Sequence, residues 1–125
     1  MPSRIATIAL DAQQPQRLAD FWCAVLGWQV LEQDDSGVSI GAADGSWPTM
    51  DLLAVTEGKA VKNRLHLDLR ADGTSTAEEL DRLLALGARR TDVGQPPGVS
   101  WVVLSDPEGN EFCLLSRTAQ QAQRP

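Results

Sequence analysis

The first half of the chain changes its hydrophobic period after about ten residues, which predicts a strand followed by a helix. Segment 4–10 is short and rich in β-branched residues, with Ile8 and Leu10 on one face and Thr7 on the other. A helix is predicted from Pro15 to Gly27, because four apolar residues recur there at helical spacing: Leu18, Phe21, Trp22 and Val25. Three short strands are predicted next, over residues 28–33, 37–41 and 50–55.

The second half begins with the same order. Segment 64–70 alternates strictly, which predicts a strand with leucines on one face and with His66 and Asp68 on the other. A capping box, from Ser75 to Glu78 or from Thr76 to Glu79, predicts the start of a helix that contains three leucines and ends at Gly87. The remaining predicted elements are a strand near 88–93, a Gly/Pro loop over 94–98, and a hairpin of 100–105 and 111–116 around a turn at 106–110.

These two orders of elements indicate an internal duplication. The interval from Thr7 to Gly27 matches that from His66 to Gly87 within one residue. Each half alone is too small to bury its helix well. The sequence therefore predicts one α+β domain over residues 1–117, built from related halves 4–55 and 64–116, followed by a polar, disordered tail over 118–125.

Composition narrows the possible partners. The chain has 125 residues, of which 42% are hydrophobic and 22% charged, and these values are ordinary for one globular domain. Its net charge of −6 disfavours nucleic acid and anionic membranes as partners. Cys23 and Cys113 lie in unlike local patterns, which favours two reduced thiols and a cytoplasmic location. No Gly-x-Ser-x-Gly, Walker A, dinucleotide or CxxC motif is present.

Three segments in this order resemble motifs of one superfamily. Residues 19–28 (ADFWCAVLGW) resemble the first helix of the vicinal-oxygen-chelate superfamily, which includes glyoxalase I, bleomycin-resistance proteins, fosfomycin-resistance enzymes and extradiol dioxygenases. Residues 106–112 (DPEGNEF) are similar to the hairpin before its last strand. Residues 62–69 (KNRLHLDL) resemble the central strand of a glyoxalase-like subgroup. The resemblance implies two βαβββ modules whose curved mixed sheets enclose a cleft, with helices on the outer faces.

The resemblance also implies where a divalent metal would bind, since the superfamily takes its ligands from the first and last strands of each module. Those positions fall at Thr7, within 51–54, at His66 and at Cys113. Threonine is not a usual ligand, and glyoxalase-type enzymes carry Glu where Cys113 stands. We therefore expect a degenerate metal site and no cofactor. The alternative is a divalent transition metal held by His66 with Asp51 or Cys113.

His66 is the only histidine in the chain, and two interpretations of it remain open. It could carry a proton or bind a ligand, with Asp68 orienting its ring, or it could be a structural residue paired with Asp68. Cys113 has no evident positive neighbour in the sequence, which favours a small residue lining the cleft over a nucleophile. Trp47 and Trp101 could each wall a ligand pocket or pack at an edge.

Two classes of function follow from these residues. The first is a metal-independent protein that binds a small, partly apolar organic molecule in a cleft lined by Thr7, His66, Asp68, Trp47 or Trp101 and Cys113, and that forms a homodimer as the resemblance implies. The second is an enzyme of lyase, isomerase, thiol transferase or dioxygenase type, with His66 and Asp68 as acid–base pair or His66 as metal ligand. The fold does not choose between them, and a protein-interaction module with an empty cleft is a third possibility.

Overall fold

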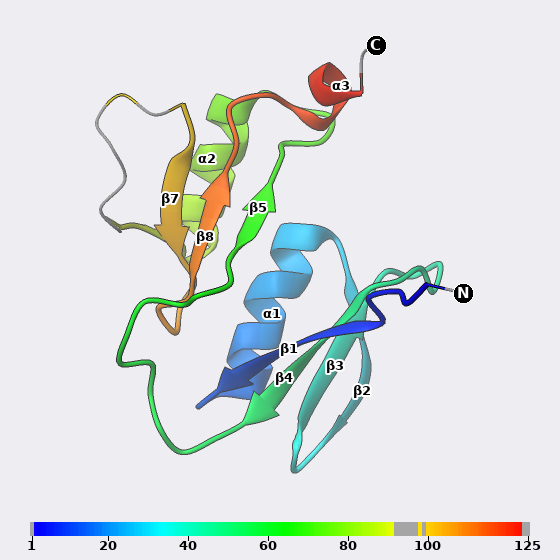
Figure 1. Cartoon of the computed structure of the whole chain (residues 1–125). Helices are drawn as coiled ribbons and strands as arrows, with labels where there is room; N and C mark the ends of the chain where they lie inside the picture. Colours follow the sequence, from blue (N-terminus) through cyan, green and yellow to red (C-terminus); the bar gives the residue numbers. More distant parts are fainter. Residues whose placement is uncertain (1, 92–97, 99, 124–125) are drawn as a thin grey trace. The chain divides into compact units, whose positions relative to one another are not determined.

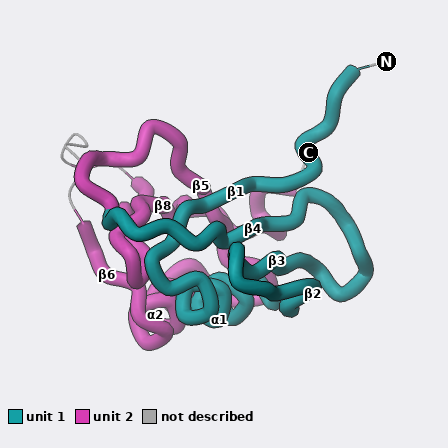
Figure 2. The backbone as a smooth tube through the Cα atoms, turned by 90° about the horizontal axis from the view of Figure 1, so that it is seen from below, with its two compact units in different colours: residues 1–58 teal, residues 59–125 magenta. Residues whose placement is uncertain are grey.

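The computed structural model describes residues 2–91, 98 and 100–123 (Figure 1). The chain forms two compact units, Met1–Gly58 and Lys59–Pro125 (Figure 2). Each unit contains a strand, a helix and three further strands, in that order. The predicted α+β class with two βαβββ modules is thereby confirmed.

The first unit is a four-stranded mixed sheet with one helix. Its elements are β1 (Thr7–Ala12), α1 (Pro15–Leu26), β2 (Gln29–Asp34), β3 (Gly37–Gly41) and β4 (Thr49–Ala54). The strand order is β1-β4-β3-β2, with β1 parallel to β4 and the other neighbours antiparallel. In this register Thr7 pairs with Thr49, and Ala9 pairs with Asp51.

Helix α1 covers one face of the first sheet. Pro15 begins the helix, where a missing N–H costs little, and Gly27 ends it with φ 69°, a left-handed conformation that glycine adopts without strain. The predicted apolar stripe is buried, and Phe21 and Trp22 meet edge to face with ring centroids 5.2 Å apart. Since α1 packs against β3 and β4, the residues pointing the other way, such as Thr7 and Asp51, form the uncovered face.

The second unit repeats this topology. Its elements are β5 (Leu67–Leu69), α2 (Thr76–Leu86), β6 (Arg89–Arg90), β7 (Val102–Ser105), β8 (Glu111–Leu114) and α3 (Ala119–Ala122). The strand order is β5-β8-β7-β6, and β5 is parallel to β8 just as β1 is to β4. Of the two capping boxes predicted for α2, the structure has the Ser75 cap, whose Oγ accepts the Glu78 N–H at 3.1 Å. Leu83 of this helix is fully buried.

One prediction on the second unit needs correction. The strand predicted over 64–70 is confined to Leu67–Leu69, and ahead of this strand the Asn63 N–H donates to the Glu111 side chain. The strand predicted near 88–93 is present as β6; residues 92–97, which include most of the predicted Gly/Pro loop, lie outside the described part.

The tail over 118–125 is the segment for which the sequence predicts disorder. Its described residues form α3, which begins with a full capping box between Thr118 and Gln121. The Ala119 N–H donates to the Ala71 carbonyl at 2.7 Å, and Gln120 bonds Asp72 at 2.6 Å. These bonds hold the segment to the loop before α2, which local composition alone did not show.

Candidate functional site

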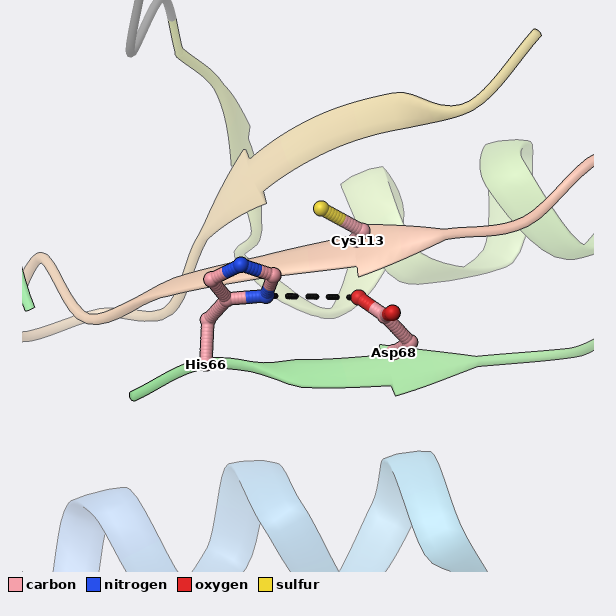
Figure 3. Close-up of side chains that lie close together, drawn as sticks. All are labelled: His66, Asp68 and Cys113. Carbon is pink, nitrogen blue, oxygen red and sulfur yellow. Dashed lines mark ion pairs between the residues drawn. The ribbon is translucent and has the colours of Figure 1, made fainter. Parts of the chain in front are cut away.

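Strands β5 and β8 bring three chemically active side chains together on one face of the second sheet (Figure 3). Asp68 pairs directly with Cys113 in the parallel ladder, so both side chains point the same way. His66 precedes Asp68 by two residues and shares that face, as the alternation in the sequence predicted. We call His66, Asp68 and Cys113 the His–Asp–Cys cluster.

The cluster is compact and open to solvent on one side. The Nδ1 atom of His66 lies 3.3 Å from Oδ1 of Asp68, and their side chains are 41% and 48% exposed. Cys113 is only 6% exposed. Its thiol pKa is raised by burial first and then by the neighbouring Asp68 carboxylate, while the Lys62 ammonium opposes the shift. The unliganded thiol therefore stays protonated at neutral pH, which disfavours the nucleophile interpretation.

An open cavity of about 530 Å³ lies in the second unit, lined by residues other than the three of the cluster. It lies on the same face of the sheet, because Glu111 precedes Cys113 by two residues on β8 and pairs with Ser105 on β7. Its lining mixes apolar, hydroxyl and charged side chains: Lys59, Ala60, Val61, Lys62, Thr91, Ser105, Glu108, Gly109 and Glu111. We call it the second-unit cavity.

Glu111 anchors the segment that forms one wall of this cavity and leads to His66. It is 8% exposed, pairs with Lys59 Nζ at 2.8 Å, and accepts the Asn63 N–H at 2.9 Å. Burial acts to raise the pKa of Glu111, but the Lys59 ammonium and the Asn63 amide outweigh it, so the net pKa is lowered. Glu111 is therefore a buried carboxylate that remains ionised.

The hairpin turn completes this anchor. Asn63 Nδ2 donates to Asn110 Oδ1 at 3.0 Å, and Asp106 Oδ1 accepts the N–H groups of Glu108 and Asn110, each at 2.9 Å. The turn residues thus hold the backbone together, in keeping with the conformational role of Asp in turns. The sequence did not predict the roles of Lys59, Asn63 and Glu111. The only signal was that Asn63 lies in the motif at 62–69 and Glu111 in the motif at 106–112.

The other predicted site residues lie in the first unit or, for Trp101, outside the lining of the second-unit cavity. Thr7 Oγ1 and Thr49 Oγ1 are hydrogen-bonded at 3.0 Å, and Asp51 accepts a hydrogen bond from Ser39 Oγ at 2.6 Å. Trp47 is 54% exposed, with the Arg4 guanidinium 4.6 Å from its ring centroid. Trp101, 38% exposed, precedes β7 and is not among the residues lining the second-unit cavity. Their roles in ligand binding stay predictions.

Comparison with known proteins now identifies the class. The family described as "Glyoxalase-like domain" matches residues 7–115, nearly the whole chain. The chain belongs to this family, and its resemblance to the vicinal-oxygen-chelate superfamily is confirmed. A comparison with curated proteins gave no match.

Solved structures show the same fold at low identity. A mutant of the fosfomycin resistance protein FosX from Listeria monocytogenes, complexed with Mn(II) and 1S,2S-dihydroxypropylphosphonic acid, has TM-score 0.70 and 16% identity over 97% of this chain and 95% of that one. A glyoxalase/bleomycin resistance protein/dioxygenase family enzyme from Burkholderia phytofirmans PsJN has TM-score 0.60 and 19% identity, over 90% of this chain and 97% of that one. A bleomycin resistance determinant encoded on transposon Tn5 has TM-score 0.60 and 18% identity, over 92% of this chain and 98% of that one.

The two units differ in how well they suit a divalent metal. In the first unit the predicted ligand position Thr7 offers only a hydroxyl already bonded to Thr49, and the Asp51 carboxylate is engaged by Ser39. In the second unit an imidazole, a carboxylate and a thiol each offer a ligand atom, and these atoms all lie within 4.8 Å of one another.

Among the described residues no helix has the length and apolarity to cross a membrane.

Proposed function

We propose that this protein binds a small, partly apolar organic molecule on the face of the second sheet that carries the His–Asp–Cys cluster, without the superfamily's usual metal set. The observation that carries the proposal is the second-unit cavity, whose volume of about 530 Å³ is in the range of small-molecule sites. It lies on the same face as the His–Asp–Cys cluster, so a ligand bound on this face can contact both the apolar wall of the cavity and the polar groups of the cluster.

The lining residues offer three kinds of contact to a ligand. Ala60 and Val61 supply apolar surface, and the exposed fraction of Val61, 78%, leaves that surface free to be covered by a ligand. Thr91 and Ser105 supply hydroxyl groups that both donate and accept. His66 and Asp68 contribute a polar edge next to the cavity, with Asp68 orienting the imidazole.

Two of the structurally similar proteins support ligand binding as the function. One is named a bleomycin resistance determinant, and the FosX mutant was crystallised with 1S,2S-dihydroxypropylphosphonic acid. Both names refer to small organic molecules. We infer that this chain takes a molecule of comparable class, and that it does so as a homodimer in the cytoplasm, where its two free thiols remain reduced.

A second candidate function is an enzyme that uses His66 and Asp68 as an acid–base pair. The 3.3 Å separation between His66 Nδ1 and Asp68 Oδ1 favours it, because a carboxylate at that distance orients the ring. The two functions differ in one respect: an enzyme converts the bound molecule, and a binding protein releases it unchanged.

A thermal-shift screen on chelator-treated, full-length protein tests binding. The probes are bleomycin, fosfomycin and a library of small aromatic and aliphatic compounds, and each compound that binds is followed by calorimetry and by NMR of the compound itself. We expect at least one compound to raise the melting temperature and to remain chemically unchanged. Val61→Asp and His66→Ala should each weaken its binding about tenfold, equivalent to about 1.4 kcal/mol.

Asp35→Asn serves as control, because Asp35 is an exposed turn residue of the first unit. Its binding should equal that of the wild type. The proposal is overturned if no compound binds without metal, or if compounds bind all variants equally. Conversion of a compound by the wild type but not by His66→Ala would favour the enzyme instead.

A further inference from the structure

The two lysines of the chain, Lys59 and Lys62, both line the second-unit cavity. We propose that the molecule bound there is an organic acid, whose carboxylate or phosphonate group is held by the Lys62 ammonium and whose apolar part lies on Ala60 and Val61. This inference rests on the proposed function and names the class of ligand that the same cavity takes. An uncharged analogue of the same shape should therefore bind more weakly.

The two lysines differ in their partners. The Nζ atom of Lys59 lies 2.8 Å from Oε2 of Glu111, and this buried carboxylate also accepts the Asn63 N–H. The charge of Lys59 is thus neutralised within the protein. Lys62 is exposed, and in the part of the chain that the structure describes it has no ion-pair partner. The Lys62 ammonium is therefore available to an anionic group of a ligand.

The acidic residues of the lining, Glu108 and Glu111, lie by Lys59. Glu111 is its ion-pair partner. The δ-carbon of Lys59 also lies 3.8 Å from the place that a Cβ would take on Gly109, the residue after Glu108. The Lys59 side chain thus runs past the hairpin turn that carries Glu108. The positive charge on this lysine offsets the acidic residues of the lining, which leaves the charge of Lys62 for the ligand.

Thr91 and Ser105 add hydroxyl donors to the lining. Ser105 pairs with Glu111 in the β7–β8 ladder and with Arg89 in the β6–β7 ladder. Thr91 follows Arg89 by two residues, and its N–H donates to the Val103 carbonyl at 3.1 Å, so its side chain points the same way as that of Ser105. Hydroxyl groups donate to carboxylate and phosphonate oxygens, and a hydrogen bond to an ionised acceptor is stronger than one between neutral groups.

The residues between the two lysines supply surface for the apolar part of the ligand. Ala60 and Val61 line the cavity, and Val61 is 78% exposed. Covering such a side chain with apolar groups of a ligand is favourable, because it removes apolar surface from water. The combination of ammonium, hydroxyl groups and apolar wall fits an acid that carries a hydrocarbon part, and it fits an inorganic anion less well.

Matched compounds test the charge. Phenylacetate and benzylphosphonate carry an anionic group on the same benzyl unit, and phenylacetamide is the uncharged analogue of phenylacetate. Full-length protein is treated with chelator and then exchanged into a chelator-free chloride buffer of low ionic strength, since chelators are themselves polycarboxylates. By calorimetry, at least one of the two anions should bind about tenfold more tightly than phenylacetamide. Added salt should weaken the binding of the anion only.

Substitution of Lys62 tests which residue recognises the anion. Lys62→Gln removes the ammonium and keeps a polar side chain, so it should lose the tenfold preference for the anion and leave the binding of phenylacetamide unchanged. Lys62→Arg should keep the preference, because it keeps the positive charge. Arg17→Gln is the matched control: it makes the same change in net charge at an exposed residue of α1, in the first unit, and should keep the preference.

The small number of lysines allows the bound anion to be located by NMR. Reductive methylation with ¹³C-formaldehyde keeps the charge of a lysine and gives one side-chain signal each for Lys59 and Lys62. The spectrum of Lys62→Arg assigns the Lys62 signal by its loss. Phenylacetate or benzylphosphonate, whichever binds more tightly, should shift this signal in a saturable manner. The tighter of the two also distinguishes a carboxylate from a phosphonate as the preferred group.

The inference is overturned if neither anion binds more tightly than phenylacetamide, if Lys62→Gln keeps the preference for the anion, or if the Lys62 signal does not move when the anion binds. The proposed function survives each of these outcomes as long as some compound of the thermal-shift library binds. If no compound of either set binds, the proposed function fails and the inference fails with it.

Discussion

Removal of the Glu111 carboxylate should destabilise the second unit and loosen the segment before His66. Glu111→Ala removes both the ion pair with Lys59 and the hydrogen bond from the Asn63 N–H, at a side chain that is 8% exposed. Glu111→Gln keeps an acceptor for Asn63 and removes only the charge. The two variants therefore separate the hydrogen bond from the ion pair.

The magnitude follows from these two contacts. A hydrogen bond to a charged group is worth about 1.5–3 kcal/mol. The ion pair adds about 1 kcal/mol, a value near that of surface pairs because the Lys59 side chain is 22% exposed and reaches water. We expect Glu111→Ala to lower the free energy of unfolding by about 2–4 kcal/mol, and Glu111→Gln by about 1 kcal/mol.

Urea unfolding followed by tryptophan fluorescence and by circular dichroism measures these losses, and coincident transitions test whether the chain unfolds in one step. Glu32→Gln is the matched control, since Glu32 is exposed on β2. It should change stability by no more than about 0.5 kcal/mol. If Glu111→Ala loses no more than this control, the anchor described for Glu111 is wrong.

The same contacts predict a pH dependence with a definite sign. The pKa of Glu111 in the folded protein is lowered by Lys59 and Asn63 against the effect of burial. Its contribution is therefore complete above the unfolded value of about 4.3 and is lost as the pH falls through the lower, folded value. The stability difference between wild type and Glu111→Gln should be constant near neutral pH and shrink below about pH 4. A difference that grows on acidification would contradict this sign.

Four further predictions concern the core, the helix ends and the thiols. Leu83→Ala should cost about 2–5 kcal/mol in urea unfolding, because Leu83 is fully buried. Gly27→Ala should cost about 1–2 kcal/mol in the same assay, since φ is 69° and the strain is purely conformational. Ser75→Ala should cost about 1 kcal/mol through loss of the Glu78 N–H bond. Burial raises the pKa of both Cys23 and Cys113, so alkylation of the native, metal-free protein, followed by mass spectrometry, should be slow at pH 7 and should still increase with pH above about 8.5, the ordinary thiol value.

Local pattern was sufficient for the helices and for most strands. The period of α1 and the glycines after α1 and α2 set the bounds of these two helices, because these signals depend on residues close in sequence. The alternation around His66 also placed His66 and Asp68 on one face correctly. In β1 the bounds moved by a few residues, but Ile8 and Leu10 remain on the less exposed face and Thr7 on the other, as predicted.

The remaining features depend on contacts between residues far apart in the chain. Strand β5 is shorter than its alternating pattern predicts, and the Asn63 N–H ahead of it bonds to Glu111 on β8, a contact that no local window contains. For the same reason the segment at 59–62, which local composition gives as a polar connector, forms a wall of the second-unit cavity. Cys113 entered the candidate site through the family resemblance, and the ladder pairing with Asp68 explains its position there.

The single histidine offers the most direct test of the central claim, that the face around His66 binds the organic molecule. Protein labelled with ¹⁵N at histidine gives the ring signals of His66 alone. Compounds that stabilise the chelator-treated protein, bleomycin and fosfomycin included, would be added in turn. The proposed function predicts that at least one of them shifts the His66 ring signals in a saturable manner without metal. If every compound that binds leaves these signals unchanged, the site lies elsewhere and the claim is contradicted.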